Sequence, residues 1–204
     1  MNATTIAVHP PLAELIFPRR TLARDATLVV AGSLFVALLA QVEVPLGFLP
    51  IPVTLQTLGV MLLGLSLGGR LGACALTAYL VEGALGLPFF AGGAGTLLAF
   101  AGPTGGYLLA FPAAAFVAGR IVERRGADRT IPGTLLALAA GHAVIYAVGL
   151  AWLAVWLHTA AGRATPGTLL DIGLLPFLPG DAVKALVAAG LVPAVRKLVA
   201  RGRS

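Results

Sequence analysis

The sequence predicts an all-α membrane protein, a bundle of six transmembrane helices joined by long irregular loops on the outer side. Two observations lead to this fold class. Hydrophobic residues make up 58% of the 204-residue chain and charged residues only 11%, whereas a soluble domain carries about 25% charged residues. Charges and Gly/Pro clusters also divide the chain into six apolar segments, each a candidate to cross a hydrocarbon core about 30 Å thick.

Each expected span is an apolar run that ends at a charge or a turn signal. The first stops before Glu43, the second at the Gly-Gly-Arg sequence 68–70, and the fourth at the basic sequence 120–125. The fifth is the clearest, because residues 131–157 contain no Asp, Glu, Lys or Arg. The expected spans are Ala26–Val42, Val53–Leu67, Leu71–Leu87, Gly105–Arg125, Ile131–Leu157 and Phe177–Ala200.

One membrane domain over residues 26–200 is therefore expected, with cytoplasmic tails over residues 1–25 and 201–204. The N-terminal tail lacks the compact apolar core and small-residue cleavage site of a signal peptide, so we expect it to be retained.

The positions of Lys and Arg predict the orientation in the membrane. With six spans and both termini inside, twelve of the fourteen Lys and Arg residues fall on the cytoplasmic side, as the positive-inside rule predicts. Only Arg163 and Lys184 lie toward the outer side. The net charge of +6 is thus a topology signal of a multi-pass cell-membrane protein, and nucleic-acid binding is not expected. The cytoplasmic set is Arg19, Arg20, Arg24, Arg70, Arg120, Arg124, Arg125, Arg129, Arg196, Lys197, Arg201 and Arg203.

The outer side collects the unusual sequence features. The loop over residues 42–57 carries three prolines, which stop helix formation, and apolar residues where a water-facing loop would be polar. The loop over residues 87–107 is rich in glycine, which allows close backbone approach to a ligand, and it ends in Pro-Thr-Gly-Gly-Tyr. Irregular backbone at membrane depth occurs only where protein buries it or where it lines a cavity. These loops therefore predict a ligand-binding face.

Asp181 and Lys184 stand three positions apart at the start of the sixth span, so they share one helix face. Each ionisable group in a membrane segment costs about 2.5 to 3.5 kcal/mol on the insertion scale, which makes the pair a functional candidate. The carboxylate can accept N–H donors of a urea or an amide, and the ammonium can meet a carbonyl or a carboxylate. A local interpretation stays open, in which Asp181 caps the helix and Lys184 pairs with it or reaches the surface.

Other single residues have structural interpretations as well. Tyr107 can be an aromatic residue of the membrane interface, and the glycine pairs can serve helix packing. His142 stands alone within the fifth span, which is more typical of a satisfied core residue than of a metal ligand. Glu82 lies within the third span, where it can reach the outer interface or a donor inside the bundle.

Three stretches carry a resemblance to a known family. They are IPVTLQTLGVMLLGLSLGGRLGA (Ile51–Ala73), GALGLPFFAGGAGTLLAFAGPTGGYLLAFPAAAFVAGR (Gly83–Arg120) and FLPGDAVKALVAA (Phe177–Ala189). Together they closely resemble the BioY family, the biotin-specific S-components of energy-coupling factor vitamin transporters. The resemblance covers most of residues 28–195, with the N-terminal tail outside it. It rests on Pro-Thr-Gly-Gly-Tyr and Pro-Gly-Asp-x-x-Lys in this order, and it implies a six-helix membrane protein that holds biotin near its outer face.

The resemblance also implies a set of substrate-binding residues. Asp181 and Lys184 resemble the polar pair that meets the biotin head group. Gly92, Gly93 and Tyr107 match the motif of the long loop and the fourth helix. Thr54 and Gln56 match the first-loop motif Pro-Val-Thr-Leu-Gln, and the apolar loop before this motif would act as a lid. The implied set is Asp181, Lys184, Gly92, Gly93, Tyr107, Thr54 and Gln56.

The same resemblance implies partners. A transmembrane T-component and two cytoplasmic ATPases would use ATP to power release inward, while this chain has no Walker A motif and is expected to bind biotin but no cofactor. S-components commonly dock the T-component through an Ala-x-x-x-Ala stripe, and the first span has no strict match to it. Some family members occur without an adjacent dedicated T-component, so a homo-oligomer or a shared energising module is an alternative.

Two other classes of function are weighed against this one. An intramembrane enzyme would need a convergent acid/base, nucleophile or metal set, and the chain offers three scattered histidines and no His-Glu-x-x-His motif. A stand-alone or proton-coupled transporter of the same or a related vitamin is the stronger alternative. In that case Glu82 or Asp181 would carry the proton, and uptake would collapse with the proton gradient.

Overall fold

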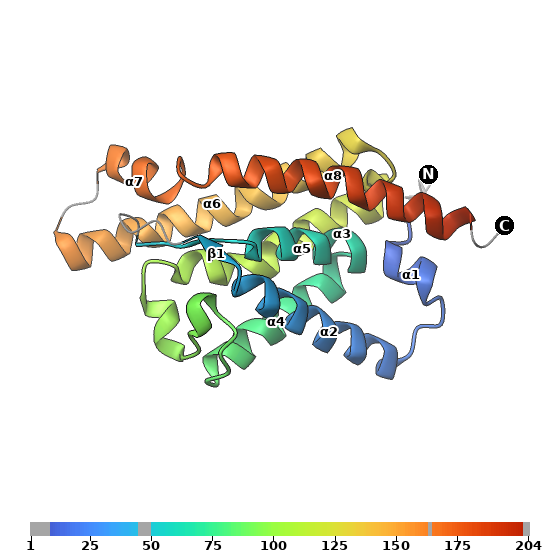
Figure 1. Ribbon diagram of the computed structural model, residues 1–204, viewed down its shortest axis with the longest axis horizontal. Coiled ribbons are helices and arrows are strands. Elements are labelled where there is room, and N and C mark those ends of the chain that lie inside the picture. The colour runs from blue at the N-terminus through green and yellow to red at the C-terminus, as the bar shows by residue number, and fades with distance from the viewer. Residues whose placement is uncertain (1–8, 45–49, 163–164, 202–204) are drawn as a thin grey trace, which may run out of the picture.

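Helices make up most of the chain in the computed structural model, which describes residues 9–44, 50–162 and 165–201 (Figure 1). The predicted all-α class is confirmed, with one pair of two-residue strands as an addition. The helices are α1 (Leu12–Ile16), α2 (Leu22–Ala40), α3 (Gln56–Leu67), α4 (Gly69–Ala84), α5 (Gly105–Arg125), α6 (Ile131–Ala161), α7 (Pro166–Gly173) and α8 (Leu178–Arg201). Short 3-10 turns are η1 (Ala91–Gly93), η2 (Leu97–Ala101) and η3 (Ala127–Arg129), and β1 (Glu43–Val44) pairs antiparallel with β2 (Val53–Thr54).

Threonine and glycine mark several helix ends. The side chains of Thr21, Thr130 and Thr165 accept backbone N–H groups in the first turns of α2, α6 and α7, which satisfies donors that have no partner within the helix. Gly126 and Gly162 end α5 and α6 in the left-handed conformation, with φ of 60° and 66°, a region that glycine enters without steric cost.

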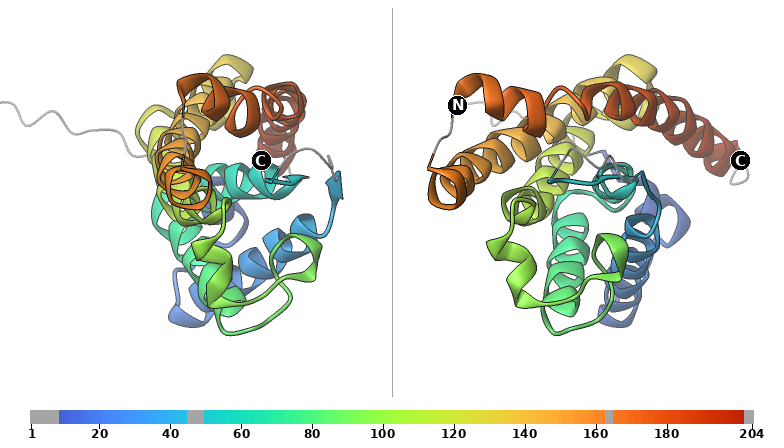
Figure 2. Two further views of the ribbon diagram at one scale, coloured as in Figure 1. Left: turned by 90° about the vertical axis from the view of Figure 1, so that its left-hand side faces the viewer. Right: turned by 60° about the vertical axis from the view of Figure 1, so that its left-hand side comes forward.

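The long helices form one bundle in which successive members run in opposite directions (Figures 1 and 2). Helices α6 and α8 pack on one side of α3 and α5, and α2 and α4 pack on the other. We call the end with α1, the start of α2 and the C-terminal end of α8 the basic end. The opposite end, with η1, η2 and α7, is called the cavity end.

Each predicted span contains a helix, and the differences have local causes. Helix α3 begins at Gln56 rather than at position 53, because Val53 and Thr54 form β2. Helix α2 begins at Leu22, four residues before the predicted start, where Thr21 caps it. Helix α8 matches its predicted span to within one residue at each end, whereas α7 was not predicted.

Three helices in the described part of the chain, α2, α5 and α6, are long and apolar enough to cross a membrane. Helix α3 is also apolar but has only 12 residues, which corresponds to about 18 Å at the helical rise. The six-span count therefore stays a prediction.

Close helix crossings depend on small residues. A Cβ atom on Gly119 of α5 would lie 2.3 Å from the backbone nitrogen of Gly69 at the start of α4, a separation that no real side chain tolerates. Glycine at 119 therefore lets the two backbones touch, as small residues do in membrane bundles. Large side chains such as Tyr79, Met61 and Leu65 fill the space between the helices.

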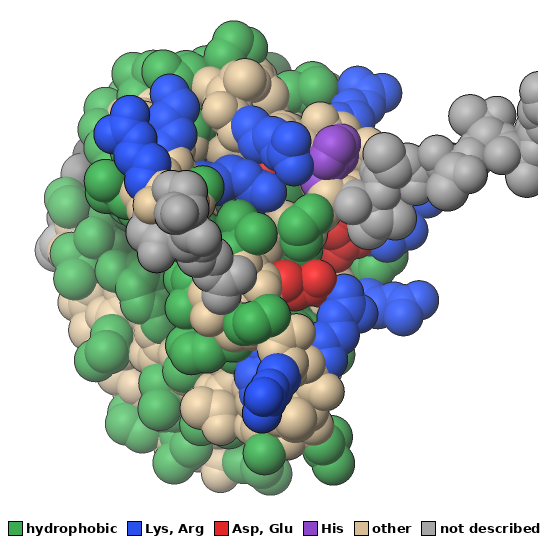
Figure 3. Space-filling model, turned by 90° about the vertical axis from the view of Figure 1, so that its right-hand side faces the viewer, with side chains coloured by type: hydrophobic (Ala, Val, Ile, Leu, Met, Phe, Trp, Pro, Cys, Tyr) green, Lys and Arg blue, Asp and Glu red, His purple; other side chains and the backbone are tan. Residues whose placement is uncertain are grey.

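The basic end carries most of the cations. Figure 3 looks onto this end and shows Lys and Arg side chains gathered around it. They come from the residues between α1 and α2, the first turn of α4, the last turns of α5 and α8, and η3. Arg203 of the predicted cytoplasmic set, and Arg163 of the predicted outer pair, lie outside the described residues. The orientation of this end toward the cytoplasm stays a prediction.

The N-terminal segment packs against the bundle. The predicted tail over residues 1–25 contains α1 and the first residues of α2, and Leu12 and Ala13 are buried. The His9 backbone N–H donates to the Glu123 carbonyl of α5 at 2.7 Å. Apolar side chains and backbone hydrogen bonds thus hold a segment whose sequence had predicted only a tail.

A buried ion pair at the basic end ties α8 to η3 and to this N-terminal segment. Arg196 of α8 donates to the Asp128 carboxylate, and both of its terminal nitrogens lie 3.1 Å from the Pro10 carbonyl. Asp128 is 0% and Arg196 7% exposed. Burial raises the pKa of the Asp128 carboxyl, and the charge of Arg196 opposes that rise.

Candidate ligand-binding site

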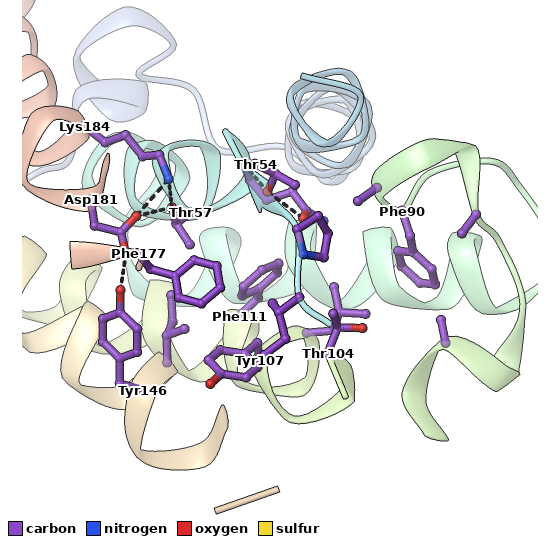
Figure 4. Close-up of a pocket in the computed structure, with 18 residues that line it drawn as sticks. Thr54, Thr57, Phe90, Thr104, Tyr107, Phe111, Tyr146, Phe177, Asp181 and Lys184 are labelled. Carbon is purple, nitrogen blue, oxygen red and sulfur yellow. Dashed lines mark hydrogen bonds and ion pairs between the residues drawn. The ribbon is translucent and has the colours of Figure 1, made fainter. Parts of the chain in front are cut away.

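A cavity of about 210 Å³ lies toward the cavity end of the bundle. Residues from the β2–α3 segment, η1, η2, α5, α6 and the start of α8 line it. Figure 4 shows Asp181, Lys184 and Thr57 together on one side of the cavity and Phe90 on the other. Most of the remaining wall is apolar, so the cavity combines one polar side with an apolar body.

The polar side is built on the first turns of α8. Asp181 and Lys184 are 7% and 9% exposed, and the Lys184 Nζ atom donates to Asp181 Oδ1 at 2.8 Å. Because α8 begins at Leu178, the two residues stand one helical turn apart on the same face. The pair predicted from the sequence therefore forms, and it lines the cavity.

Two hydroxyl groups complete the hydrogen bonding of this pair. Thr57 of α3 donates to Asp181 Oδ1 and accepts from Lys184 Nζ, each at 2.9 Å. Tyr146 of α6 donates its hydroxyl to Asp181 Oδ2. Buried charges are tolerated when they are paired and hydrogen-bonded in this way. Three helices thus converge on one carboxylate.

Thr57 and Tyr146 were not predicted from the sequence, although each shows a signal there. Thr57 directly follows the Thr-Leu-Gln motif, at the start of an apolar helix. Tyr146 stands four residues after His142 in a charge-free span, so the two polar side chains share a helix face. Which helix would face Asp181 could not be read from the sequence.

A second network joins the β2–α3 segment to α4. Thr54 donates its hydroxyl to Gln56 Oε1 at 2.8 Å, and Gln56 Nε2 donates to the Tyr79 hydroxyl at 2.6 Å. Tyr79 in turn donates to the Phe89 carbonyl at 3.2 Å. Thr54 and Gln56 both line the cavity. Their polar groups are engaged with each other and with Tyr79, so they also fix the shape of this wall.

Tyr107 lines the cavity from the first turn of α5. Its hydroxyl donates to the Gly173 carbonyl at the end of α7 at 2.8 Å, and its ring lies 6.5 Å from the ring of Phe177. With Phe111, these rings form the apolar wall below the ion pair (Figure 4). Tyr107 therefore joins α5 to the segment that leads into α8, rather than facing the membrane interface.

Gly92 and Gly93 do not line the cavity, whereas their neighbours Ala91 and Ala94 do. Both glycines have positive φ, 67° and 71°, which side chains rarely adopt. They form the turn that places Ala91, Ala94 and Phe90 at the wall. Their described role is to shape the loop.

The predicted lid lies partly outside the described residues, which exclude 45–49. On its C-terminal side, Ile51 and Pro52 line the cavity, and Ile51 is buried. The loop over residues 42–57 therefore contributes to the wall at its described end.

The cavity can hold a small solute with an apolar body. The Lys184 ammonium can meet a carbonyl or a carboxylate, and the Asp181 carboxylate can accept N–H groups. Apolar pockets with a few polar groups that fix orientation are typical of small-molecule sites. In the described part of the chain, no group of three His, Cys, Asp or Glu side chains could hold a metal ion.

Comparisons with known proteins show what this chain is similar to. The sequence model of the BioY family matches residues 9–201, so the match includes much of the tail that the resemblance had been expected to leave out. The chain is 41% identical over 179 residues to the biotin transporter BioY of Rhizobium etli, which covers 84% of this chain and 92% of that protein. It is also 41% identical over 176 residues to the biotin transporter BioY of Rhodobacter capsulatus, which covers 83% of this chain and 90% of that protein.

The fold is similar to a crystal structure of the S-component for biotin from an ECF-type ABC transporter. The TM-score is 0.76 at 27% sequence identity, and the similarity covers 88% of this chain and 95% of that one. The transporter relatives and the apolar helices together support a membrane protein.

Proposed function

Because the chain belongs to the BioY family, we propose that it is a membrane-embedded subunit that captures biotin for uptake. Its relatives are biotin transporters, and a similar solved structure is a biotin S-component. The observation within this chain that carries the proposal is the Asp181–Lys184 pair, buried on one side of an otherwise apolar cavity.

The chemistry of biotin fits this cavity. Its ureido ring offers two N–H groups and one carbonyl, its thioether ring and chain are apolar, and its tail ends in a carboxylate. The Asp181 carboxylate suits the N–H groups, and the Lys184 ammonium suits a carbonyl or a carboxylate. The rings of Tyr107, Phe111 and Phe177 suit the apolar part. Thr54 and Gln56, together with the turn at Gly92 and Gly93, shape the rest of the site.

The proposal includes a topology and partners. Six spans within residues 26–200 would place the basic end in the cytoplasm, with both termini, and the cavity end outside. A transmembrane T-component and two cytoplasmic ATPases would then power inward release of biotin, since the sequence of this chain contains no Walker A motif. Without a dedicated T-component, a homo-oligomer or a shared energising module would serve instead.

A second candidate function is proton-coupled transport by this chain alone. Glu82 of α4 favours it, because its Oε2 atom is buried and has no hydrogen-bond partner among the described residues. An ionisable residue within a membrane segment is a candidate member of a proton pathway. In proteoliposomes, uptake that collapses with a protonophore and needs no ATP would favour this candidate, whereas uptake that needs ATP and partner subunits would favour the first.

The test of biotin capture is a calorimetric titration of the detergent-purified protein with biotin, with thiamine as an unrelated vitamin. We expect saturable heat with biotin and none with thiamine. A folded protein that gives no heat with biotin would contradict the proposal.

A further inference from the structure

His142 lies behind the polar side of the cavity without lining it. It stands on α6 one turn before Tyr146, and its side chain is 13% exposed. The His142 Nδ1 atom lies 2.9 Å from the Leu138 carbonyl, and its Nε2 atom lies 3.7 Å from Asp181 Oδ2. Nε2 is buried and has no hydrogen-bond partner in the described part of the chain.

The Leu138 contact fixes which ring nitrogen carries the hydrogen. A carbonyl only accepts, so Nδ1 must donate, and in the neutral ring Nε2 then presents a lone pair. That lone pair stands near a carboxylate oxygen, and two acceptors do not stabilise each other. A proton on Nε2 would turn this contact into a charge-assisted pair between the imidazolium and Asp181.

The charged and titratable groups around His142 decide when that proton binds. Helix α8 contributes Asp181, and through it Lys184, and α6 itself contributes Tyr146. The hydroxyl of Tyr107 on α5 donates to the Gly173 carbonyl instead. Helix α3 contributes the uncharged Thr57, and Asp171 of α7 is exposed. Asp181 and Lys184 cancel in charge, so a proton on His142 would leave the buried cluster with one positive charge.

An anionic ligand would compensate that charge. The carboxylate of biotin adds one negative charge to the cavity, and at neutral pH this group is fully ionised because carboxyl groups titrate near pH 4. Occupancy of the cavity therefore favours the proton on His142, and by linkage the proton favours occupancy.

We propose that His142 and Asp181 form a proton-binding site behind the ligand cavity, and that binding of an anionic ligand takes up a proton at His142 Nε2. The proposal rests on the proposed function, because biotin is the ligand it invokes. His142 is a positioning residue here: it acts through Asp181, whose Oδ2 atom it approaches, while Lys184 bonds to Oδ1.

The test is calorimetric titration of the full-length protein with biotin at one pH, in buffers that differ in ionisation enthalpy. The dependence of the observed heat on that enthalpy gives the number of protons exchanged. We expect uptake of a fraction of one proton, and by linkage an affinity for biotin that rises by up to about tenfold for each unit by which the pH is lowered, measured between about pH 8 and pH 6. Biotinamide, which lacks the carboxylate, should take up less.

His142→Gln keeps an amide donor near Asp181 but cannot titrate. We expect it to bind biotin with no buffer dependence and with an affinity that changes less than about twofold across the same pH range. His158→Gln is the matched control, because His158 is exposed in the last turn of the same helix, and it should keep the proton uptake of the natural chain.

The outcomes separate the two proposals. Biotin binding without proton uptake, with proton release, or with uptake that persists in His142→Gln would overturn the proton site and leave biotin capture standing. An absence of biotin binding in every buffer would overturn both.

Discussion

Two buried ion pairs stand at opposite ends of the bundle and differ in what completes them. The cavity pair, Asp181–Lys184, is completed by the hydroxyls of Thr57 and Tyr146 and borders a cavity. The basic-end pair, Asp128–Arg196, is completed by the Pro10 carbonyl and closes the basic end. Both aspartates are nearly inaccessible to solvent, at 7% and 0% exposure.

The difference indicates which pair can bind a ligand and which pair stabilises the fold. An ammonium has three donors, and among the described residues Lys184 uses two of them, on Thr57 and Asp181, which leaves one for a ligand. The guanidinium of Arg196 directs both terminal nitrogens at the Pro10 carbonyl of the N-terminal segment. A point charge beside a cavity suits exchange of partners, whereas a planar fork suits a fixed contact.

Breaking the basic-end pair should have the largest effect on stability. Arg196→Ala leaves the Asp128 charge buried without its partner and frees the Pro10 carbonyl, so we expect the free energy of unfolding to fall by about 3–5 kcal/mol. Thermal unfolding in detergent measures this. Arg125→Ala removes an exposed arginine at the same end and should change stability by less than about 0.5 kcal/mol. Equal effects of the two substitutions would refute the structural role.

The cavity wall should be sensitive to overpacking. A Cβ atom on Gly83 would lie 2.3 Å from the ring of Phe90, which is buried against Tyr79 and lines the cavity. We expect Gly83→Ala to lower the free energy of unfolding by about 1–3 kcal/mol and to weaken biotin binding, both measured on the purified protein. Gly190→Ala is the control, because nothing lies within 4 Å of its added carbon; a similar loss there would count against this packing.

Removing the cation of the cavity pair should weaken biotin binding by at least tenfold, which is about 1.4 kcal/mol. Calorimetry on Lys184→Ala checks this. Lys184→Arg is the sharper test, because it should not restore the affinity: a planar fork does not replace a point charge in a closed pocket. Lys197→Ala, at the other lysine of the chain, should leave the affinity unchanged. Natural affinity in Lys184→Ala would return the pair to a local capping role.

The smallest effect is expected at Tyr107. Tyr107→Phe keeps the ring against Phe177 but removes the donor to the Gly173 carbonyl, so the free energy of unfolding should fall by about 1 kcal/mol. Thr159→Val removes an exposed hydroxyl that donates to the backbone of α6, and it should have a smaller effect. The unfolding temperatures of the two variants compare them, and no loss in Tyr107→Phe would mean that this bond contributes nothing.

The sequence predicted the helices well where charge and apolar runs set their limits. Helix α5 has the predicted bounds, and α6 begins at the predicted Ile131, because these ends depend on local signals such as Gly105 and Thr130. The short α7 was missed, because its eight residues, which begin at Pro166 directly after Thr165, lie between the fifth and sixth predicted spans and are too few to be a span themselves. The packing of the N-terminal segment was missed as well, because it depends on Arg196, far away in the sequence.

The candidate site could be predicted only in part, because some of its contacts lie within one helix and others join different helices. Asp181 and Lys184 meet within one helix turn, so their contact follows from their spacing. Thr57, Tyr146 and His142 approach Asp181 from two other helices, and only the packing of α3 and α6 against α8 brings them together. Gly92 and Gly93 were chosen as ligand neighbours by resemblance, while their positive φ angles explain them as a turn.

The affinity of Asp181→Asn for biotin, measured beside that of Asp171→Asn, tests the central claim most directly. Asn keeps the size of the side chain but removes the charge that holds Lys184, whereas Asp171 is an exposed carboxylate on α7. We predict binding at least tenfold weaker in Asp181→Asn, about 1.4 kcal/mol, with natural affinity in Asp171→Asn and both proteins folded. Equal, natural affinity in the two variants would contradict the assignment of this cavity to biotin.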